Sequence, residues 1–405
     1  MQCYALGMTR LNRVIGLPGL CLYGIGVTLG AGIYALVGEI AGLAGLYAPW
    51  AFVLAGALAA FTGLSYAELG SRYPESAGEA AYLAHGFKRR WLTAAAGYGV
   101  ALSGAISSAV VLHGFAGYLG ALAPVPAWMA ISGALAILVL IAIWGVRQSI
   151  MIAGIITLIE AGGLILIIAV ATPGAITAPP PVDIGPVPWS GLFAASVMAF
   201  FAFIGFEDIA NMAEEVKRPR RTLPLAILIT LSVSSVIYLA VAWVAVRALP
   251  PDVLAGEGGP LAAVFEHATG LNGDGIAAIA LLAMVNGALV QIVMVARVLY
   301  GLAQRGLAPS ALGGVHPVRR TPVMATLIAA VAIAIFAMSG ALGTLAIAAS
   351  TVTLLVFSLV NAALLALRLR GEAGVTGSFS APIWVPAVGL VASLGVAVGA
   401  MVSGL

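Results

Sequence analysis

The sequence has few charged residues. Only 8% of its 405 residues are Asp, Glu, Lys or Arg, whereas 62% are apolar, and a soluble domain carries about 25% charged residues. So few charges could not cover a surface in contact with water, and most of the surface is therefore expected to face lipid. The net charge of +3 is small and gives no indication of nucleic-acid binding. This scarcity favours an integral membrane protein.

Cysteine and histidine are also scarce. The chain has two cysteines and four histidines, and neither type recurs at a metal-ligand spacing. Cys3 lies in the N-terminal tail, Cys21 lies in the first apolar segment, and the histidines are scattered. We therefore expect no disulfide framework, no metal and no cofactor. An intramembrane enzyme is disfavoured for the same reason, because it would need a metal cluster or a nucleophile–base pair.

Long apolar segments occupy nearly the whole chain. Segments of about 20 residues can each cross a bilayer core of about 30 Å, and they predict eleven transmembrane helices. The predicted ranges are 14–40, 47–69, 93–122, 127–145, 149–171, 189–213, 223–248, 275–302, 322–339, 342–367 and 382–403. The expected fold class is all-α integral membrane, with residues 1–405 forming one transmembrane domain.

Loop charges predict the orientation. If the N-terminus is cytoplasmic, every one of the 18 basic residues except Arg247 falls at or near a cytoplasmic helix end. Positively charged loops favour the cytoplasmic side. The sequence therefore predicts a multi-pass protein of the cell membrane with a cytoplasmic N-terminus.

The first predicted helix contains an unusual concentration of glycine. Gly24, Gly26, Gly30 and Gly32 lie within nine residues, and each costs a helix about 1 kcal/mol relative to alanine. Within a membrane, a broken backbone is tolerated only where it lines a cavity or is buried in protein. We therefore predict a break here, with close helix packing through small residues as the alternative.

The sixth predicted helix carries a second sign of interruption. Gly205 lies beside Glu207 and Asp208 within an apolar span, and freed backbone groups and a charge both need a wet cavity. Interruptions at matching positions of two inverted halves indicate a central binding site. We therefore expect a five-plus-five inverted repeat with halves 14–171 and 189–367, followed by an extra helix at 382–403.

Broken helices offer two kinds of backbone group to a ligand. A half-helix that begins at the break presents free N–H groups and a positive dipole end, which suit a carboxylate. Free carbonyl groups at the opposite end suit an ammonium group or a small cation. A site with both is matched to a zwitterion, so the sequence predicts an amino acid as the ligand.

Further motifs accompany the two breaks. They are Gly26–Tyr34, Tyr66–Leu69 followed by Pro74 and Ala77-Gly78, Phe200–Pro224, Arg297–Pro309 and Thr321-Pro322. Together they resemble the amino acid–polyamine–organocation transporter superfamily over roughly residues 10–370, and the match at Phe200–Pro224 is the most specific. The resemblance implies the LeuT-type inverted repeat, although members of the family usually have twelve helices.

The resemblance also implies a function and residue roles. Backbone around Gly30–Gly32 would hold the substrate carboxylate, and Phe203–Phe206 would receive the ammonium group. The candidate substrate-binding residues are Thr28, Gly30, Ala31, Gly32, Phe201, Phe203, Ile204 and Gly205. The phenylalanines would wall or gate the pocket, with packing as the alternative. The implied function is secondary active amino acid transport, coupled to an ion or by exchange. A polyamine or other organic cation is the alternative substrate.

Two carboxyl groups within the membrane are candidates for coupling or gating. One is Glu207, or its neighbour Asp208. The other is Glu160, about 16 Å into its helix and near the middle of the bilayer core. An ionised carboxylate there costs about 2.5–3.5 kcal/mol, so Glu160 should be paired, bound to a cation or protonated.

The resemblance places Glu160 where some proton-coupled members have a lysine. Glutamate has the opposite charge, so it could bind sodium or carry a proton. We expect a proton, because Ala296 lacks the hydroxyl group that would help a sodium site. A neutral Glu160 hydrogen-bonded to nearby backbone is the structural alternative.

Two expectations concern helix ends. Glu68 lies at the inner end of the second predicted helix near Arg72, and we expect the two to form an ion pair. On the outside, Pro260–Thr269 could form a short helix over the entrance or serve as a passive connector.

Overall fold

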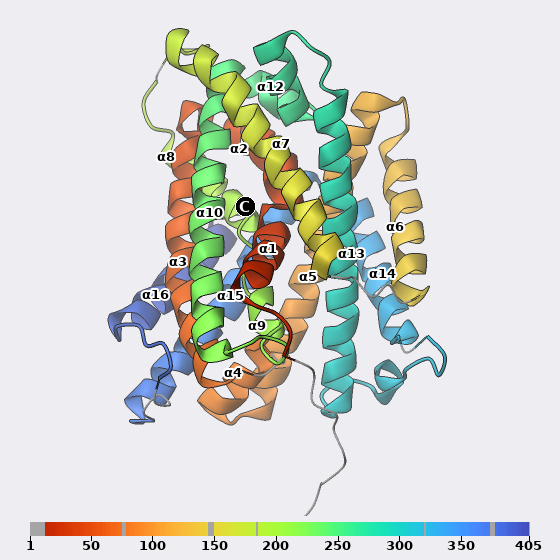
Figure 1. The fold of residues 1–405 in the computed structure, drawn as a ribbon, viewed down its shortest axis with the longest axis vertical. Coiled ribbons are helices and arrows are strands. Elements are labelled where there is room, and N and C mark those ends of the chain that lie inside the picture. The colour runs from red at the N-terminus through yellow and green to blue at the C-terminus, as the bar shows by residue number, and fades with distance from the viewer. Residues whose placement is uncertain are drawn as a thin grey trace, which may run out of the picture.

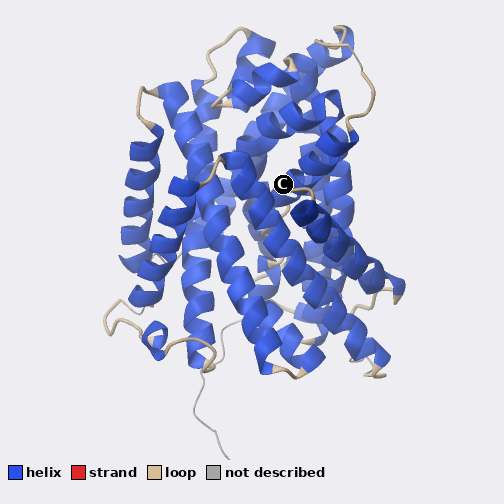
Figure 2. Ribbon diagram, turned by 180° about the vertical axis from the view of Figure 1, so that it is seen from behind, coloured by secondary structure: helices blue, strands red, loops and turns tan. Residues whose placement is uncertain are grey.

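The computed structural model describes residues 13–74, 78–144, 150–183, 185–319, 321–372 and 377–404, without the side chains of residues 150–153. Over these ranges the chain is helical, and its β contact is one parallel bridge between Ile15 and Val216. Most of the helices are long and stand side by side in one bundle (Figures 1 and 2). The expected all-α fold class is confirmed.

The helices follow the apolar segments closely. They are α1 Leu17–Leu29, α2 Ala31–Ala44, α3 Ala48–Arg72, α4 Gly78–Phe87, α5 Arg90–Leu122, α6 Ala127–Trp144, α7 Ile150–Thr177, α8 Trp189–Phe201, α9 Asp208–Asn211, α10 Pro219–Ala248, α11 Pro251–Gly256, α12 Pro260–Thr269, α13 Asp274–Gln304, α14 Val323–Ser339, α15 Leu342–Leu369 and α16 Trp384–Val402. The helix expected at Pro260–Thr269 is therefore confirmed as α12, whereas α4 and α11 were not predicted.

The described residues include eight helical runs that are long and apolar enough to cross a membrane. The first run, Leu17–Arg72, contains α1, α2 and α3, while α8 and α14 are shorter apolar helices. The chain is thus a multi-pass membrane protein. The count of eleven crossings, the inverted repeat and the orientation stay predictions. The predictions that concern Cys3, Ala77 and the basic residues Arg10, Arg147 and Arg320 lie outside the described residues.

Tryptophan marks the ends of the peripheral helices. Six tryptophans at or near helix ends are at least 56% exposed: Trp50, Trp91, Trp128, Trp144, Trp189 and Trp384. Tryptophan is enriched where a membrane helix meets the water interface. By contrast, α2 lies in the interior and is buried along most of its length. The helix break between α1 and α2 therefore lies among other helices.

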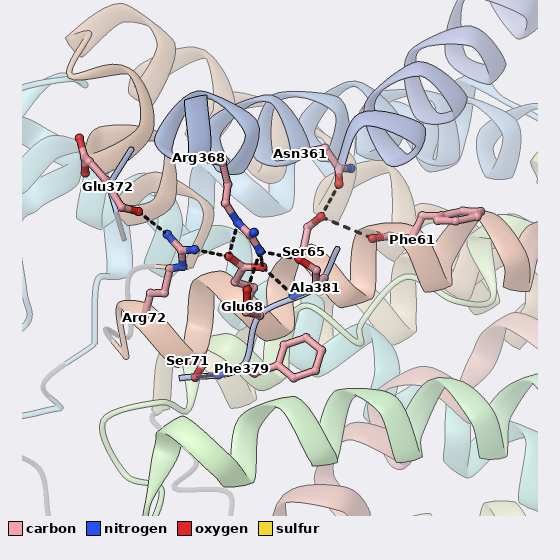
Figure 3. Close-up of polar contacts among 11 residues, drawn as sticks. Phe61, Ser65, Glu68, Ser71, Arg72, Asn361, Arg368, Glu372, Phe379 and Ala381 are labelled. Atoms are coloured by element: carbon pink, nitrogen blue, oxygen red, sulfur yellow. Dashed lines mark hydrogen bonds and ion pairs between the residues drawn. The ribbon is translucent and has the colours of Figure 1, made fainter. Parts of the chain in front are cut away.

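A buried carboxylate joins α3 to α15. Glu68 is fully buried, and its two oxygens lie 2.5 Å from Arg72 Nη2 and 2.5 Å from Arg368 Nη2. The Ala381 backbone N–H donates to the same carboxylate at 2.9 Å (Figure 3). The expected pair with Arg72 is confirmed. Arg368 and Ala381 add contacts that fix the chain leading into α16.

A row of hydrogen bonds continues this contact along the helices. Ser65 Oγ donates to Asn361 Oδ1 at 2.6 Å (Figure 3), and Asn361 Nδ2 donates to Thr62 Oγ1 at 2.9 Å. Gly389 of α16 lies so close that a Cβ atom there would be 2.6 Å from Asn361 Oδ1. The polar groups of α3 and α15 therefore satisfy one another beneath α16.

Arg247, the exception to the charge pattern, has a structural partner. Its Nε donates to the carbonyl oxygen of Ala175 at 2.9 Å, and its Nη2 donates to that of Ala178. These carbonyl groups belong to the C-terminal end of α7, where helical carbonyls lack intrahelical donors. Arg247 therefore caps α7 from the neighbouring helix α10.

Candidate functional site

The first predicted break is present. Helix α1 ends at Leu29, Gly30 has the non-helical angles φ −44° and ψ −133°, and α2 begins at Ala31. No side chain caps the N-terminus of α2 within the described part of the chain. The first N–H groups of a helix have no intrahelical acceptor, so Ala31 and Gly32 present backbone donors at this point.

The second predicted break is also present. Helix α8 ends at Phe201, residues 202–207 form turns, and α9 begins at Asp208. Gly205 has φ +122°, a conformation that a residue with a side chain rarely adopts. The Glu207 carboxylate accepts the Gly205 N–H at 2.8 Å. Among the described residues, no hydrogen bond reaches the carbonyl oxygens of Phe203 and Ile204.

The two breaks touch each other. A Cβ atom on Gly32 would lie 2.8 Å from Ala202 Cα, and one on Gly205 would lie 2.7 Å from Val27 Cγ1. The fully buried Tyr238 of α10 joins them from the side. Its hydroxyl group is within hydrogen-bonding distance of the Thr28 carbonyl oxygen and lies 2.7 Å from that of Ala202. The backbone groups freed by both breaks are thus brought to one place.

A small cavity of about 40 Å³ lies at this junction. Five of the predicted substrate-binding residues line it: Thr28, Ala31, Gly32, Phe201 and Ile204. The opposite wall comes from α5 and α13. No charged side chain of the described residues lines this cavity, so its polar character comes from backbone and neutral side chains.

The other predicted substrate-binding residues support the breaks from outside the cavity. Gly30 is the turning point before α2. Phe203 is fully buried, with its ring 5.1 Å from that of Tyr238, so it packs beside the break. Gly205 contacts Val27, and Glu207 holds the Gly205 N–H. The predicted residues thus fall into two groups: some line the cavity, and the others hold the backbone of the two breaks in place.

Glu160, which belongs to α7, lies beside the first break. Thr157 approaches Gly26 below the break, because a Cβ on Gly26 would lie 1.9 Å from Thr157 Oγ1, and Gly163 approaches Tyr34 above it. Glu160 lies between these two contacts and is fully buried. Its backbone carbonyl accepts the Tyr34 hydroxyl at 2.8 Å. Within the described chain neither carboxyl oxygen has a hydrogen-bond partner.

Sequence reasoning missed the polar wall of the cavity. Ser107 of α5 and Asn286 and Gln291 of α13 all line it. A signal was present, because Asn286 and Gln291 are the two amide side chains in the middle of the mostly apolar segment 275–302. The described residues contain no group of three or more His, Cys, Asp or Glu that could hold a metal ion.

Comparison with known proteins gives a consistent result. The amino acid permease family matches residues 15–403. The chain is 30% identical to the branched-chain amino acid permease BcaP of Bacillus subtilis, over 90% of this chain and 83% of that protein. It is 31% identical to the mitochondrial cationic amino acid transporter 3 of Arabidopsis thaliana, over 89% of this chain but 63% of that longer protein. It is 28% identical to the methylthioribose transporter of Bacillus subtilis, over 95% and 87% of the two chains.

Proposed function

This chain belongs to the amino acid permease family, and on that premise we propose that it is a secondary active transporter that carries an amino acid across the cell membrane. One observation supports this most strongly. The uncapped N-terminus of α2 and Ile204 of the second break, whose carbonyl group accepts no hydrogen bond within the described residues, line one cavity. Donors for a carboxylate and acceptors for an ammonium group therefore lie within reach of the same small molecule.

In this proposal the substrate carboxylate binds the backbone N–H groups of Ala31 and Gly32, where the positive end of the α2 dipole favours an anion. The ammonium group binds the carbonyl groups of Phe203 and Ile204. Phe201 and Thr28 form the adjoining wall. A polyamine or other organic cation fits less well, because no acidic side chain of the described residues lines the cavity.

The proposal is tested by uptake into proteoliposomes, with Gly32→Leu as the site variant. A leucine at this position would displace Ala202, whose Cα lies 2.8 Å from the Cβ position, and would fill the space for the carboxylate. Gly133→Leu is the matched control, because Gly133 is exposed on α6 with nothing within 4 Å of its Cβ position. We expect Gly32→Leu to abolish uptake at equal membrane abundance while Gly133→Leu retains it. Equal uptake by both variants would rule out this site.

We further propose that Glu160 carries a coupling proton. This proposal is supported by the position of the Glu160 carboxyl group, which is buried level with the first break and has no hydrogen-bond partner within the described residues. A buried carboxyl group is more stable when protonated, and a change in substrate or conformation near the break would alter that preference. The loop-charge pattern similarly supports a cytoplasmic N-terminus.

Coupling is tested by comparing wild type with Glu160→Gln under imposed proton and sodium gradients. We expect proton-driven accumulation by the wild type only, while both proteins exchange substrate when no gradient is imposed. Full gradient-driven accumulation by Glu160→Gln with an unchanged pH profile would show that Glu160 has no coupling role. Accumulation driven by a sodium gradient alone would show that the coupling ion is sodium and not a proton.

A further inference from the structure

The cavity has neutral polar groups that the backbone sites do not use. Ser107 on α5 is buried, and within the described residues its Oγ has no hydrogen-bond partner. The Oε1 atom of Gln291 on α13 is likewise buried without a partner. Both residues line the cavity. The wall that faces the two breaks therefore carries unused hydrogen-bonding capacity.

Gln291 approaches α5 about one turn before Ser107. A Cβ atom on Gly104 would lie 3.2 Å from Gln291 Oε1, and Ser107 is three residues further along α5. Residues three apart share one face of a helix. The Ser107 hydroxyl and the Gln291 amide therefore border the same part of the cavity.

The rest of this wall is uncharged and, apart from Asn286, small and apolar. Val111 lies one turn beyond Ser107, and Val290 precedes Gln291, and both line the cavity. The cavity is small, about 40 Å³. A charged side chain finds no counter-charge among the residues that line it.

We infer that the substrate is a small amino acid whose uncharged side chain carries a hydroxyl group, bound between Ser107 and Gln291. A hydroxyl group is both a donor and an acceptor, so it can donate to Gln291 Oε1 while accepting from the Ser107 hydroxyl. The valine methyl groups suit the methyl group of threonine. This inference rests on the proposed function, because it concerns the side-chain end of the same amino acid site.

Threonine and valine provide the sharpest comparison, because a hydroxyl group in one replaces a methyl group in the other. Valine would leave the Ser107 and Gln291 groups unpaired on binding, and leaving a buried polar group unpaired lowers affinity by roughly 5- to 100-fold. A site that hydrogen-bonds a substrate hydroxyl group discriminates strongly against the analogue that lacks it. We therefore expect threonine and serine to bind at least about fivefold more tightly than valine.

The experiment measures binding by thermal shift and uptake by wild type with threonine, serine, valine, leucine and lysine. Ser107→Ala and Gln291→Met are then compared with Ser132→Ala, whose serine is exposed on α6. We expect both cavity variants to reduce the threonine preference to within about threefold of valine, through weaker threonine binding, and the control to leave it unchanged.

The outcomes separate the two proposals. Transport of valine, leucine or lysine in preference to threonine would overturn the hydroxyl site while amino acid transport stands. An undiminished threonine preference in both cavity variants would also overturn it. Failure of every amino acid to bind or be transported would overturn the proposed function together with this inference. The wild-type comparison of threonine with valine needs no variant, so the test holds even if a variant does not fold.

Discussion

Replacing Gly205 with alanine tests whether the contact between the two breaks builds the site. At φ +122° a residue with a side chain is strained, and such a conformation costs about 2–3 kcal/mol. The added Cβ would also lie 2.7 Å from Val27 Cγ1 and 3.1 Å from the Val27 carbonyl oxygen. Since about 1.4 kcal/mol corresponds to a tenfold change, the strain alone should lower the equilibrium constant for forming the intact break roughly 30- to 150-fold.

The assay is substrate affinity, measured on purified protein by thermal shift with increasing substrate. The apparent Kd should rise by up to the same factor, because only the intact arrangement binds. Gly133→Ala is the control, since its Cβ would meet nothing within 4 Å, and it should leave affinity unchanged while stabilising α6 by about 0.5–1 kcal/mol. An affinity for Gly205→Ala within threefold of wild type would refute the reasoning.

Three further substitutions test the supporting structure. Glu68→Gln should lower the melting temperature, because the buried Arg72 and the partly buried Arg368 would lose their carboxylate partner, and breaking a buried ion pair costs about 3 kcal/mol; an unchanged melting temperature would contradict this. Arg247→Ala should speed hydrogen exchange in the last turn of α7 only, because that turn loses its donors. Burial raises the pKa of Glu79 on α4 above its ordinary value of 4.5, so the protonated form is favoured in the folded protein. The contribution of Glu79 to the free energy of unfolding should therefore be largest below pH 4.5 and fall as pH rises through the raised pKa, and Glu79→Gln should remove that contribution.

Local sequence signals predicted the helices and their breaks. A segment that crosses the bilayer must be long and apolar, so the helices could be located from composition alone. The glycines near Gly30 and the pair Gly205 and Glu207 indicate the breaks in the same way, because neither signal depends on which helices pack nearby. Helix α4 escaped prediction because Gly78–Phe87 is short and mixed in character. It is covered by other helices rather than by lipid, so no strong apolar signal was available.

Long-range partners could not be predicted from the sequence. Glu68 and Arg368 are 300 positions apart, and only the packing of α3 against α15 selects this arginine from many. The same limit applies to Ser107 and Gln291, whose importance depends on which helix faces the cavity. Conversely, Phe203 has the residue type expected of a pocket wall, but the turn at the second break points it toward Tyr238.

The hydroxyl group of Tyr238 serves two carbonyl groups with one hydrogen atom. Thr28 and Ala202 both lie within its reach, yet a phenol has a single O–H to donate. The two half-helices therefore compete for it, and a rotation about one C–O bond passes the hydrogen from one to the other. A relative displacement of the two segments changes which carbonyl group is satisfied while keeping the number of hydrogen bonds constant.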